Sequence, residues 1–440
     1  ICQFEFFCGW IAASVKTEYR FMIRYFLKIL ILLFVNVTYS QSGTISPYSY
    51  FGLGEGNFKG TQINRFMGGL EIYNDSIHAN LSNPSSYAKL KLTTYSLGLN
   101  YRNNKLTDAN DSKSIISSGL DYIGVAIPTN KFGFGFGIIP YTSVGYKLNQ
   151  LDSSSFPNIL NQYQGEGGVN KVFFSLGFNL LKYFSFGATI NYDFGKLKYQ
   201  TSKYVDDVFL GTILINESSV SGIDIKLATN FEVSMNNNLD LHVMVSYVPQ
   251  SSLNSTNKRQ VITSAISNPS NLGEVVEIDL ADTGLDITEI QLPSSLGIGF
   301  GFGKKSRWFT GGQYIMTQNS NFKNSFNPIP NVRYKDGSQL SIGGFFIPDF
   351  SSITSYWKRI VLRMGFRHEV TGILKNNFEI KETGLNFGLG LPLPGYSNLN
   401  IGLEYGSRGS KNSNMLEENF WTLRLGFSLN DRWFVKRKYN

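Results

Sequence analysis

Cysteine, histidine and charge are scarce in this 440-residue chain. Both cysteines, Cys2 and Cys8, lie close to the first residue, in a stretch that we expect to be absent from the mature protein. The mature chain then has no disulfide, no thiol nucleophile and no cysteine ligand for a metal. Charged residues make up 16%, against about 25% in typical soluble proteins. The net charge is +8 for the full chain and, without residues 1–40, 36 minus 30 or +6, a modest excess that needs no nucleic acid partner to explain it.

A long hydrophobic run that could span a membrane as a helix is also missing. The mean hydropathy is −0.12, and only Tyr25–Val37 approaches the required hydrophobicity. A helical bundle in an inner membrane is therefore excluded. No Pro-, Gly- or Ser-rich linker divides the chain, which favours one large closed structure.

The apolar run has the features of a signal peptide. A basic start follows Met22, the first methionine, and the apolar stretch Ile29–Val37 is too short to span a membrane comfortably. Residues 38–41 resemble a cleavage site. We therefore predict a cleaved signal peptide over residues 22–40 and interpret residues 1–21 as upstream translation.

Catalytic and metal-binding patterns are weak. The three histidines, His78, His242 and His368, are too dispersed for a metal site with the usual ligand spacings. Asp240, His242 and Ser246 share one face of a predicted strand, as the members of a hydrolytic triad would. A triad needs hydrogen bonds between its members, yet residues two apart on a strand lie about 6 to 7 Å apart. We therefore predict neither an enzyme nor a cofactor.

What the chain has in abundance is alternation with a period of two. In Trp421–Leu429, apolar side chains fall on one side of an extended chain and polar ones on the other. Aromatic residues reach 15% and there are 44 glycines, which suits a barrel with aromatic girdles. Opposite Ile223 and Ile225 stand Asp224 and Lys226. A β-sandwich would expose those charges outward, whereas a membrane barrel would turn them towards a wet lumen.

The links between the predicted strands favour the barrel. From Leu90 onward we count fourteen strands whose short and long connections alternate, as in outer-membrane barrels with tight periplasmic turns and long external loops. The longest predicted loop is Pro249–Gln291, and one periplasmic link, Asp349–Arg359, is longer than the rule expects. The other long loops are predicted over about residues 103–113, 147–170, 200–218, 319–337, 371–377 and 407–417. We predict an all-β, antiparallel transmembrane barrel over residues 90–430.

Two stretches fall outside the predicted wall. Residues 41–89 lack clear alternation, and a barrel of about fourteen strands is too wide for its own side chains to fill. We predict that this segment plugs the lumen. Residues 431–440 form a basic tail, which we expect to be solvated in the periplasm.

Several short motifs recur in a fixed order along the mature chain. Near the N-terminus they are Ser46–Gly54, Arg65–Gly69 and Asn83–Tyr87. Further motifs lie at residues 292–295, 381–394, 404–409 and 430–434. Together they resemble the FadL family of outer-membrane transporters for hydrophobic molecules, in the form common among Bacteroidetes. The N-terminal motifs look like the plug of that family with its Asn-Pro-Ala signature, although Ser85 stands in place of the alanine.

The resemblance implies a 14-stranded barrel in the bacterial outer membrane, an internal plug, and a wall gap at a kink in the third strand. It implies plug or gating roles for Arg65, Gly68, Gly69, Asn83, Pro84 and Ser85. For the gap it implies Gly137, Pro140 and Tyr141, since proline has no N–H for the ladder and glycine tolerates bends. The alternative is that Pro140 merely ends a strand near the outer rim.

Charged side chains are predicted to line the lumen. They are Arg363, Arg367, Glu369, Glu404 and Arg424. The simplest interpretation is a salt-bridged interior. The alternative is that they orient the carboxylate head group of a ligand, because arginine forks bind any carboxylate.

Two functions from different classes follow. The first is a passive, plug-gated channel for hydrophobic or amphipathic small molecules such as long-chain fatty acids, surrounded by outer-membrane lipid. The second is a non-transporting barrel of the same fold that serves as partner or scaffold subunit of an envelope secretion or assembly complex. The predicted loop Pro249–Gln291 motivates the second, because loops of this length are usually functional or disordered. A continuous apolar channel would favour transport, and a lumen sealed by ionic contacts would favour the scaffold.

Overall fold

The computed structural model describes residues 43–433, except 58–59, 109–110, 130, 154–155, 236–238, 266–267 and 410–414. The predicted signal peptide, the upstream residues 1–21, both cysteines and the tail from residue 434 lie outside the described residues. In the described part of the chain, no helix is long and apolar enough to cross a membrane.

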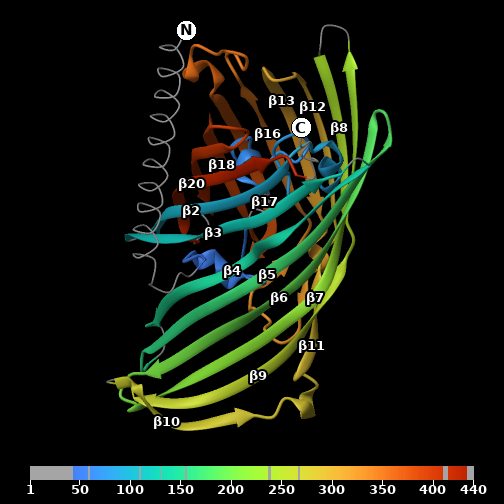
Figure 1. The fold of residues 1–440 in the computed structure, drawn as a ribbon. Helices are drawn as coiled ribbons and strands as arrows, with labels where there is room; N and C mark the ends of the chain where they lie inside the picture. The colour runs from blue at the N-terminus through green and yellow to red at the C-terminus, as the bar shows by residue number, and fades with distance from the viewer. Residues whose placement is uncertain are drawn as a thin grey trace, which may run out of the picture. The chain divides into compact units, whose positions relative to one another are not determined.

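The chain forms a closed antiparallel barrel of fourteen strands (Figure 1). The ring closes because β20 pairs with β2. The wall strands are β2 (Thr93–Thr107), β3 (Ser112–Pro128), β4 (Phe132–Asp152), β5 (Ile159–Leu181), β6 (Phe184–Val205), β7 (Leu210–Met235), β8 (Leu239–Val248), β9 (Ser251–Ala265), β10 (Asn268–Ile278), β11 (Ile287–Leu292), β12 (Ser295–Lys304), β13 (Trp308–Thr317), β16 (Gly337–Phe346), β17 (Val361–Lys375), β18 (Phe378–Pro392), β19 (Asn398–Arg408) and β20 (Glu417–Asp431).

Some wall strands are interrupted, so there are more labels than strands in the ring. Both β8 and β9 pair with β7, and they form one strand broken near Pro249. Likewise β10 and β11 both pair with β9 while β12 pairs with β8, so β10, β11 and β12 form one strand, interrupted between β10 and β11 and again at Pro293. Proline removes a ladder donor, which explains the breaks at Pro249 and Pro293. The remaining short elements are β14 (Lys323–Asn324), β15 (Val332–Tyr334), η4 (Ala281–Thr283), η5 (Asn319–Asn321) and η6 (Tyr356–Arg359).

Alternating side chains give the wall an apolar outside and a polar inside. Phe387 and Leu423 are 50% and 40% exposed on the outer face, while their neighbours Asn386 and Arg424 are buried inside. The same contrast recurs on strands around the ring. These Phe and Leu side chains therefore do not meet across two stacked sheets, and the sandwich alternative is wrong. The all-β barrel predicted from the sequence is confirmed.

Two aromatic girdles border this apolar belt. On one rim the rings of Tyr101 and Trp421 lie 5.6 Å apart, and on the other the rings of Tyr95 and Trp433 lie 5.6 Å apart. Tyr95 and Tyr101 both lie on β2, six residues apart, so with a rise of about 3.4 Å per residue and a tilt of about 40° they are separated by roughly 16 Å along the barrel axis. The outward apolar side chains of β2 and β20 lie between and beside these two aromatic pairs.

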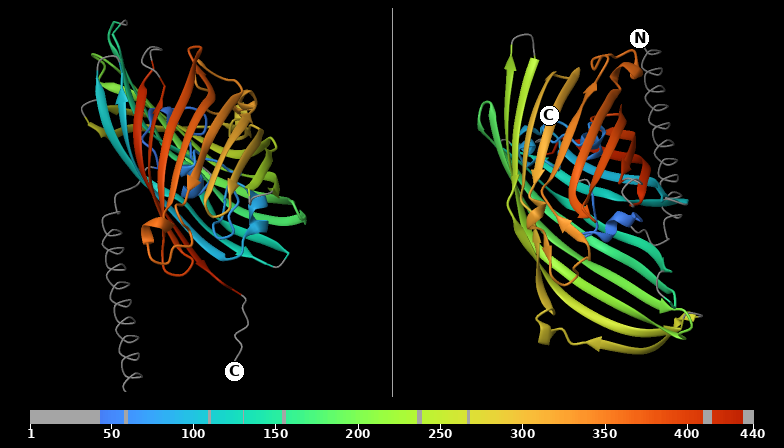
Figure 2. Two further views of the ribbon diagram at one scale, coloured as in Figure 1. Left: turned by 90° about the horizontal axis from the view of Figure 1, so that it is seen from above. Right: turned by 180° about the vertical axis from the view of Figure 1, so that it is seen from behind.

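The wall is much taller on one side than a membrane requires (Figure 2). We call the end where β2 begins and β20 ends the terminal end, and the opposite end the extended end. The strands β4 to β7 run for 21, 23, 22 and 26 residues. A membrane crossing needs only about 9 to 11 residues per strand. These strands therefore continue well past the belt at the extended end.

This extended wall corrects the predicted loops. The predicted loop Pro249–Gln291 is occupied mainly by β9, β10 and β11, and most of residues 147–170 and 200–218 is strand as well. Past the lipid belt, both faces of a strand meet water or protein, so the apolar alternation that marks a membrane strand disappears. Main-chain pairing still satisfies the backbone there. Polar composition was therefore a poor guide to loops in this region.

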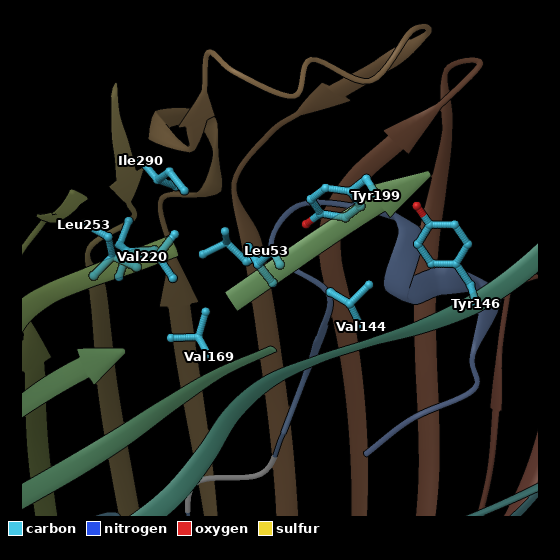
Figure 3. Packing of buried hydrophobic residues seen from close by; sticks show 10 residues of the cluster. Leu53, Val144, Tyr146, Val169, Tyr199, Val220, Leu253 and Ile290 are labelled. Atoms are coloured by element: carbon cyan, nitrogen blue, oxygen red, sulfur yellow. The ribbon is translucent and has the colours of Figure 1, made fainter. Parts of the chain in front are cut away.

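The N-terminal segment, residues 43–92, packs against the inner side of the wall. It contains η1 (Pro47–Tyr50), β1 (Glu55–Gly56), α2 (Gln62–Phe66) and η2 (Pro84–Lys89). Its side chains Phe66, Met67, Leu70 and Ile72 are fully buried. Near the extended end, Leu53 of this segment joins a cluster with Val144, Tyr146, Val169 and Leu253 from the wall (Figure 3).

Candidate functional site: the barrel interior and the gap between β3 and β4

Glycines on the inner face of the wall let the N-terminal segment lie directly against it. A Cβ atom at Gly365 would overlap the backbone of Met67 and Gly68, and one at Gly187 would overlap Pro84 and Ser85. Only glycine leaves room for such a close approach of two main chains. The backbone of the segment is therefore in direct contact with the backbones of β17 and β6.

The predicted plug residues lie in this region of contact between the segment and the wall. Asn83 directly precedes η2. Its side-chain Oδ1 accepts two hydrogen bonds from Ser85, one from the backbone N–H at 3.1 Å and one from the hydroxyl at 2.7 Å. The Asn83 amide also donates to Asn230 of β7 at 3.1 Å. Gly68 and Gly69 turn the chain after α2 with φ of 76° and 89°, in the left-handed region that favours glycine. These residues fix the path of the segment, and their gating role stays a prediction.

A buried ion-pair network joins the segment to the wall. Arg65 pairs with Glu404 of β19 at 2.7 Å, and Arg424 of β20 pairs with the same carboxylate at 3.1 Å and with Asp121 of β3 at 3.0 Å. Arg367 of β17 also reaches Glu404, at 3.4 Å. Charged groups of α2, β3, β17, β19 and β20 are therefore held together in one cluster.

The network continues towards the extended end through residues that the sequence reasoning did not single out. Glu55 of β1 pairs with Arg102 of β2 at 2.7 Å and with Arg408 of β19 at 2.8 Å. Glu418 of β20 accepts a hydrogen bond from Ser46 at 2.7 Å. The sequence did carry a signal that could have identified three of them. Arg102, Arg408 and Glu418 are charged residues at lumen-facing positions of predicted strands.

Two charged residues of the segment, Arg65 and Glu55, both stay ionised in the buried network. Burial lowers the pKa of the Arg65 guanidinium to about 10, although the neighbouring Glu404 opposes the shift, so Arg65 stays cationic at neutral pH. Burial by itself would raise the pKa of Glu55, but Arg102 and Arg408 outweigh burial and lower the pKa to about 2. Glu55 is therefore a carboxylate across the physiological pH range.

The opposite side of the interior carries a second group of ion pairs. Lys171 of β5 contacts Asp224 of β7 and lies 3.2 Å from Asp193 of β6. Lys226 of β7 pairs with Glu71 of the segment at 2.8 Å. The predicted strand charges Asp224 and Lys226 thus face inward, as a barrel requires.

The other candidates are distributed among separate contacts. Arg367, Glu369, Glu404 and Arg424 come together in the network, whereas Arg363 donates to Asn400 at 2.9 Å. Each of these arginines is engaged with groups of its own chain, which fits the salt-bridged interpretation. Their role in orienting a ligand head group stays a prediction.

The residues that resembled a triad also have other neighbours. Asp240 accepts a hydrogen bond from Ser234 at 2.5 Å, and His242 faces Glu232 at 3.8 Å. In the residues that the structure describes, no group of three or more His, Asp or Glu side chains is arranged to hold a metal ion.

A cavity of about 490 Å³ lies between the segment and the wall. Its lining includes charged side chains from both halves of the barrel. These are Glu55, Arg65, Glu71, Arg102, Asp121, Lys171, Asp224, Lys226, Arg367, Glu369, Glu382, Arg408 and Arg424. Apolar side chains such as Leu53, Ile139, Phe173 and Ile380 also line the cavity. The cavity is therefore of mixed character, and each of its charged side chains takes part in an ion pair within the chain.

The wall is interrupted between β3 and β4, which diverge in Figure 1. Their ladder runs only from the pair Pro128 and Gly133 to the pair Ile123 and Ile138. The neighbouring β4–β5 ladder shifts register between Pro140 and Thr142. Gly137, Pro140 and Tyr141, the candidates for a wall opening, thus lie where β4 leaves β3. Passage of a substrate at this point stays a prediction.

The start of this gap is filled by the chain itself. Glu55 and Gly56 of β1 pair with Ser143 and Thr142 of β4. The backbone N–H of Asn57 donates to the carbonyl of Tyr141 at 2.9 Å. The segment therefore adds a short strand to β4 immediately after this register shift at Pro140–Thr142, which we call the kink of β4.

The comparison with protein families identifies the group to which the chain belongs. Residues 22–440 match the family model described as BamG. The chain belongs to the BamG family. This family is distinct from FadL, so the resemblance noted in the sequence extends to architecture and not to an assignment within FadL. A search of curated proteins gave no match for this BamG-family chain.

Solved structures with the same fold include two proteins described as toluene transporters and one described as a FadL homologue. The toluene transporter TbuX of Ralstonia pickettii is 14% identical, with a TM-score of 0.57 over 86% of this chain and 100% of that chain. The toluene transporter TodX of P. putida is 15% identical, with a TM-score of 0.58 over 85% and 99% of the two chains. A Pseudomonas aeruginosa FadL homologue is 12% identical, with a TM-score of 0.53 over 86% and 99%. At these identities the likeness shows the fold.

Proposed function

We propose that this BamG-family barrel is a partner or scaffold subunit of an envelope secretion or assembly complex in the bacterial outer membrane. The observation that carries the proposal is the ion-pair network that ties the N-terminal segment to the wall. Arg65 and Glu55, at two separate points of the segment, are both buried in this network. Opening the lumen would require separating several buried ion pairs, each costing about 3 to 5 kcal/mol when one partner is lost.

Several features support a barrel that does not conduct hydrophobic molecules. Charged side chains interrupt the apolar lining of the interior cavity, and each of them is engaged in an ion pair within the chain. Immediately after Pro140, the gap beside β4 is occupied by β1 of the same chain and is not open there. Membership in a family distinct from FadL agrees with a changed function on the same architecture.

The extended end offers the surface for a protein partner. At the tips of the β4–β5 and β6–β7 hairpins, Phe156 is 100% exposed and Phe209 is 76% exposed. Leu151, Val208 and Leu210 are exposed beside them. The two tips are joined, since the amide of Asn158 donates to Asp206 at 2.9 Å. Several large apolar side chains exposed together outside the lipid belt are typical of a protein interaction site.

The double variant Phe156→Asp/Phe209→Asp tests this function. The barrel is extracted from native membranes in a mild detergent, and the mass and stoichiometry of the particle are measured on native gels and by mass spectrometry. We expect the wild type to migrate as a defined complex and the double variant to migrate as the barrel alone. Lys203→Ser, an exposed change close to the same tips, is the matched control and should retain the complex. A wild-type protein that is extracted only as a monomer would contradict the proposal.

The second candidate function is a conduit for hydrophobic small molecules. The observation in its favour is the wall gap at Pro140, in a fold shared with the toluene transporters TbuX and TodX. A deletion strain that loses uptake of exogenous long-chain fatty acids, with uptake restored by the Phe156→Asp/Phe209→Asp variant, would favour the conduit. Unchanged uptake in the deletion strain favours the scaffold.

A further inference from the structure

The edge of β4 beyond the kink has main-chain groups that point into the gap. Gly145 donates its N–H to the Ser49 hydroxyl at 3.1 Å and not to β5, so this N–H lies on the gap side of β4. Groups on alternate residues of a strand point the same way. The N–H and C=O groups of Lys147, Asn149 and Leu151 therefore also face the gap.

The N-terminal segment covers only the first part of this edge. It contacts Tyr141, Thr142, Ser143 and Gly145 of β4. Among the described residues, no hydrogen bond is made to the gap-facing main chain of residues 147, 149 and 151. The facing strand β3 is likewise without a partner on its gap side from Ser112 to Tyr122 in the described part of the chain.

This open edge lies outside the lipid belt. The lipid-facing run of β4 is Phe132, Phe134 and Phe136, with Ile138 at its end. After the kink, the exposed outward positions begin with Lys147 and Asn149, which are polar. An open sheet edge is excluded from hydrocarbon but tolerated in water, where it is a template for an added strand.

The inner side of the gap would bind apolar side chains. Tyr146 and Leu148 of β4 belong to or pack against the buried cluster that contains Leu53 and Val144. The ring of Tyr50 stands edge-on to Tyr146 at 5.2 Å. An added strand with apolar residues at every second position would extend this cluster, while its main chain paired with β4.

We propose that the edge of β4 from Lys147 to Leu151 binds an extended segment of a partner protein by β-strand addition. The inference rests on the proposed scaffold function and names the mode of binding. β1 is the internal precedent, because it already forms an antiparallel pair on the same edge at Thr142 and Ser143. The partner segment continues the sheet where β1 stops, with its apolar side chains on the side of Tyr146 and Leu148. Main-chain pairing supplies affinity and the alternate pockets supply specificity.

A proline substitution separates main-chain pairing from side-chain contact. Asn149→Pro removes a donor that faces the gap and leaves the ladder with β5 intact, since proline is accepted on the free side of an edge strand. Asn149→Ala removes the same side chain but keeps the N–H, and it serves as the matched control. Heat-modifiable gel migration shows for both variants that the barrel is folded.

The measurement is hydrogen–deuterium exchange of the amides of Lys147, Asn149 and Leu151. It compares the complex extracted from native membranes with the same barrel after its partners have been stripped by a stronger detergent. We expect these amides to exchange about tenfold or more slowly in the complex. The Asn149→Ala variant should keep this protection at residues 147 and 151, and the Asn149→Pro variant should lose it.

Two results would overturn the inference, and they are distinguishable from failure of the proposed function. Equally fast exchange of these amides in the complex and in the stripped barrel, with a complex still recovered, would show that the partner binds elsewhere. Equally slow exchange in both would show that residues of this chain, or a second copy of it, cover the edge. If no complex is recovered and the amides exchange freely, the scaffold function fails together with the inference.

Discussion

Arg65 of α2 holds Glu404 of β19 through two hydrogen bonds, with its Nε 2.9 Å and its Nη2 2.7 Å from the two carboxylate oxygens. This paired geometry is the strong form of an arginine–carboxylate contact. The two residues are far apart in the chain, one in the N-terminal segment and one near the end of the wall. The contact therefore fixes where the segment sits inside the ring.

Replacing Arg65 should loosen the N-terminal segment. Arg65→Ala leaves the buried Glu404 carboxylate with one cation fewer, and we expect docking of the segment to lose about 3 kcal/mol. The measurement is the rate of limited proteolysis within residues 43–92 in detergent. Lys89→Ala is the control, because its 3.8 Å pair with Glu232 is partly exposed and should contribute under about 1 kcal/mol. Equal cleavage rates in the two variants would contradict a structural role for Arg65.

A methyl group on the inner wall should displace the segment where the two main chains touch. At Gly365 the added Cβ would overlap the backbone of Met67 and Gly68, so we expect Gly365→Ala to cost at least about 1 to 3 kcal/mol. At Gly312 the nearest atom would lie 3.7 Å away, so Gly312→Ala should be tolerated. Thermal unfolding and proteolysis of the segment would measure both. A stable, protease-resistant Gly365→Ala protein would show that the backbone of the segment does not contact β17 at this position.

Acid should release the segment through Glu55. Its pKa is lowered from 4.5 to about 2 in the folded protein, so its stabilising effect is fully present above about pH 5 and is lost as the pH falls towards 2. Amide exchange of residues 43–92, corrected for intrinsic rates, should therefore rise across this window. Glu55→Gln cannot form the same ion pairs with Arg102 and Arg408, so its segment should exchange faster at pH 6 and change less between pH 5 and 2. A wild type with the same flat profile as Glu55→Gln would contradict this role.

Charge placed in the lipid belt should destabilise the barrel more than charge placed at its extended tip. Leu425 on β20 faces outward between the two aromatic pairs, opposite Leu99 of β2, and Leu425→Arg should cost about 2 to 4 kcal/mol near the membrane midplane. Leu210 is 48% exposed at the start of β7 beyond the belt, and Leu210→Arg should change stability by about 0.5 kcal/mol or less. Reversible unfolding by urea in lipid vesicles would measure the difference. Similar losses of stability for the two variants would contradict the placement of Leu210 outside the lipid belt.

The wall within the membrane could be predicted because its physics is local. A strand such as Trp421–Leu429 shows its two faces in the sequence, since one side meets lipid and the other meets polar groups. The same reasoning failed for Pro249–Gln291, where β9 and β10 pair in water and neither face needs to be apolar. Main-chain pairing alone has no signature in a single sequence.

The interior could be predicted only in part. Charges at lumen-facing positions such as Arg367 and Arg424 were visible from the alternation. Their joint engagement with Glu404 and Arg65 depends on which strands become neighbours when the ring closes, and periodicity carries no information on that. Glu55 was missed because it lies in β1, a strand of only two residues.

By itself, the sequence indicated a membrane barrel, because its period-two strands place charges such as Asp224 opposite apolar residues and are joined by alternating short and long links. Tertiary structure alone decided which charges of the N-terminal segment and of the wall form ion pairs in the interior, and that the described residues leave the edge of β4 unpaired past the belt. Both depend on contacts between residues hundreds of positions apart, and on where pairing stops, which are properties of the closed sheet and not of any one segment.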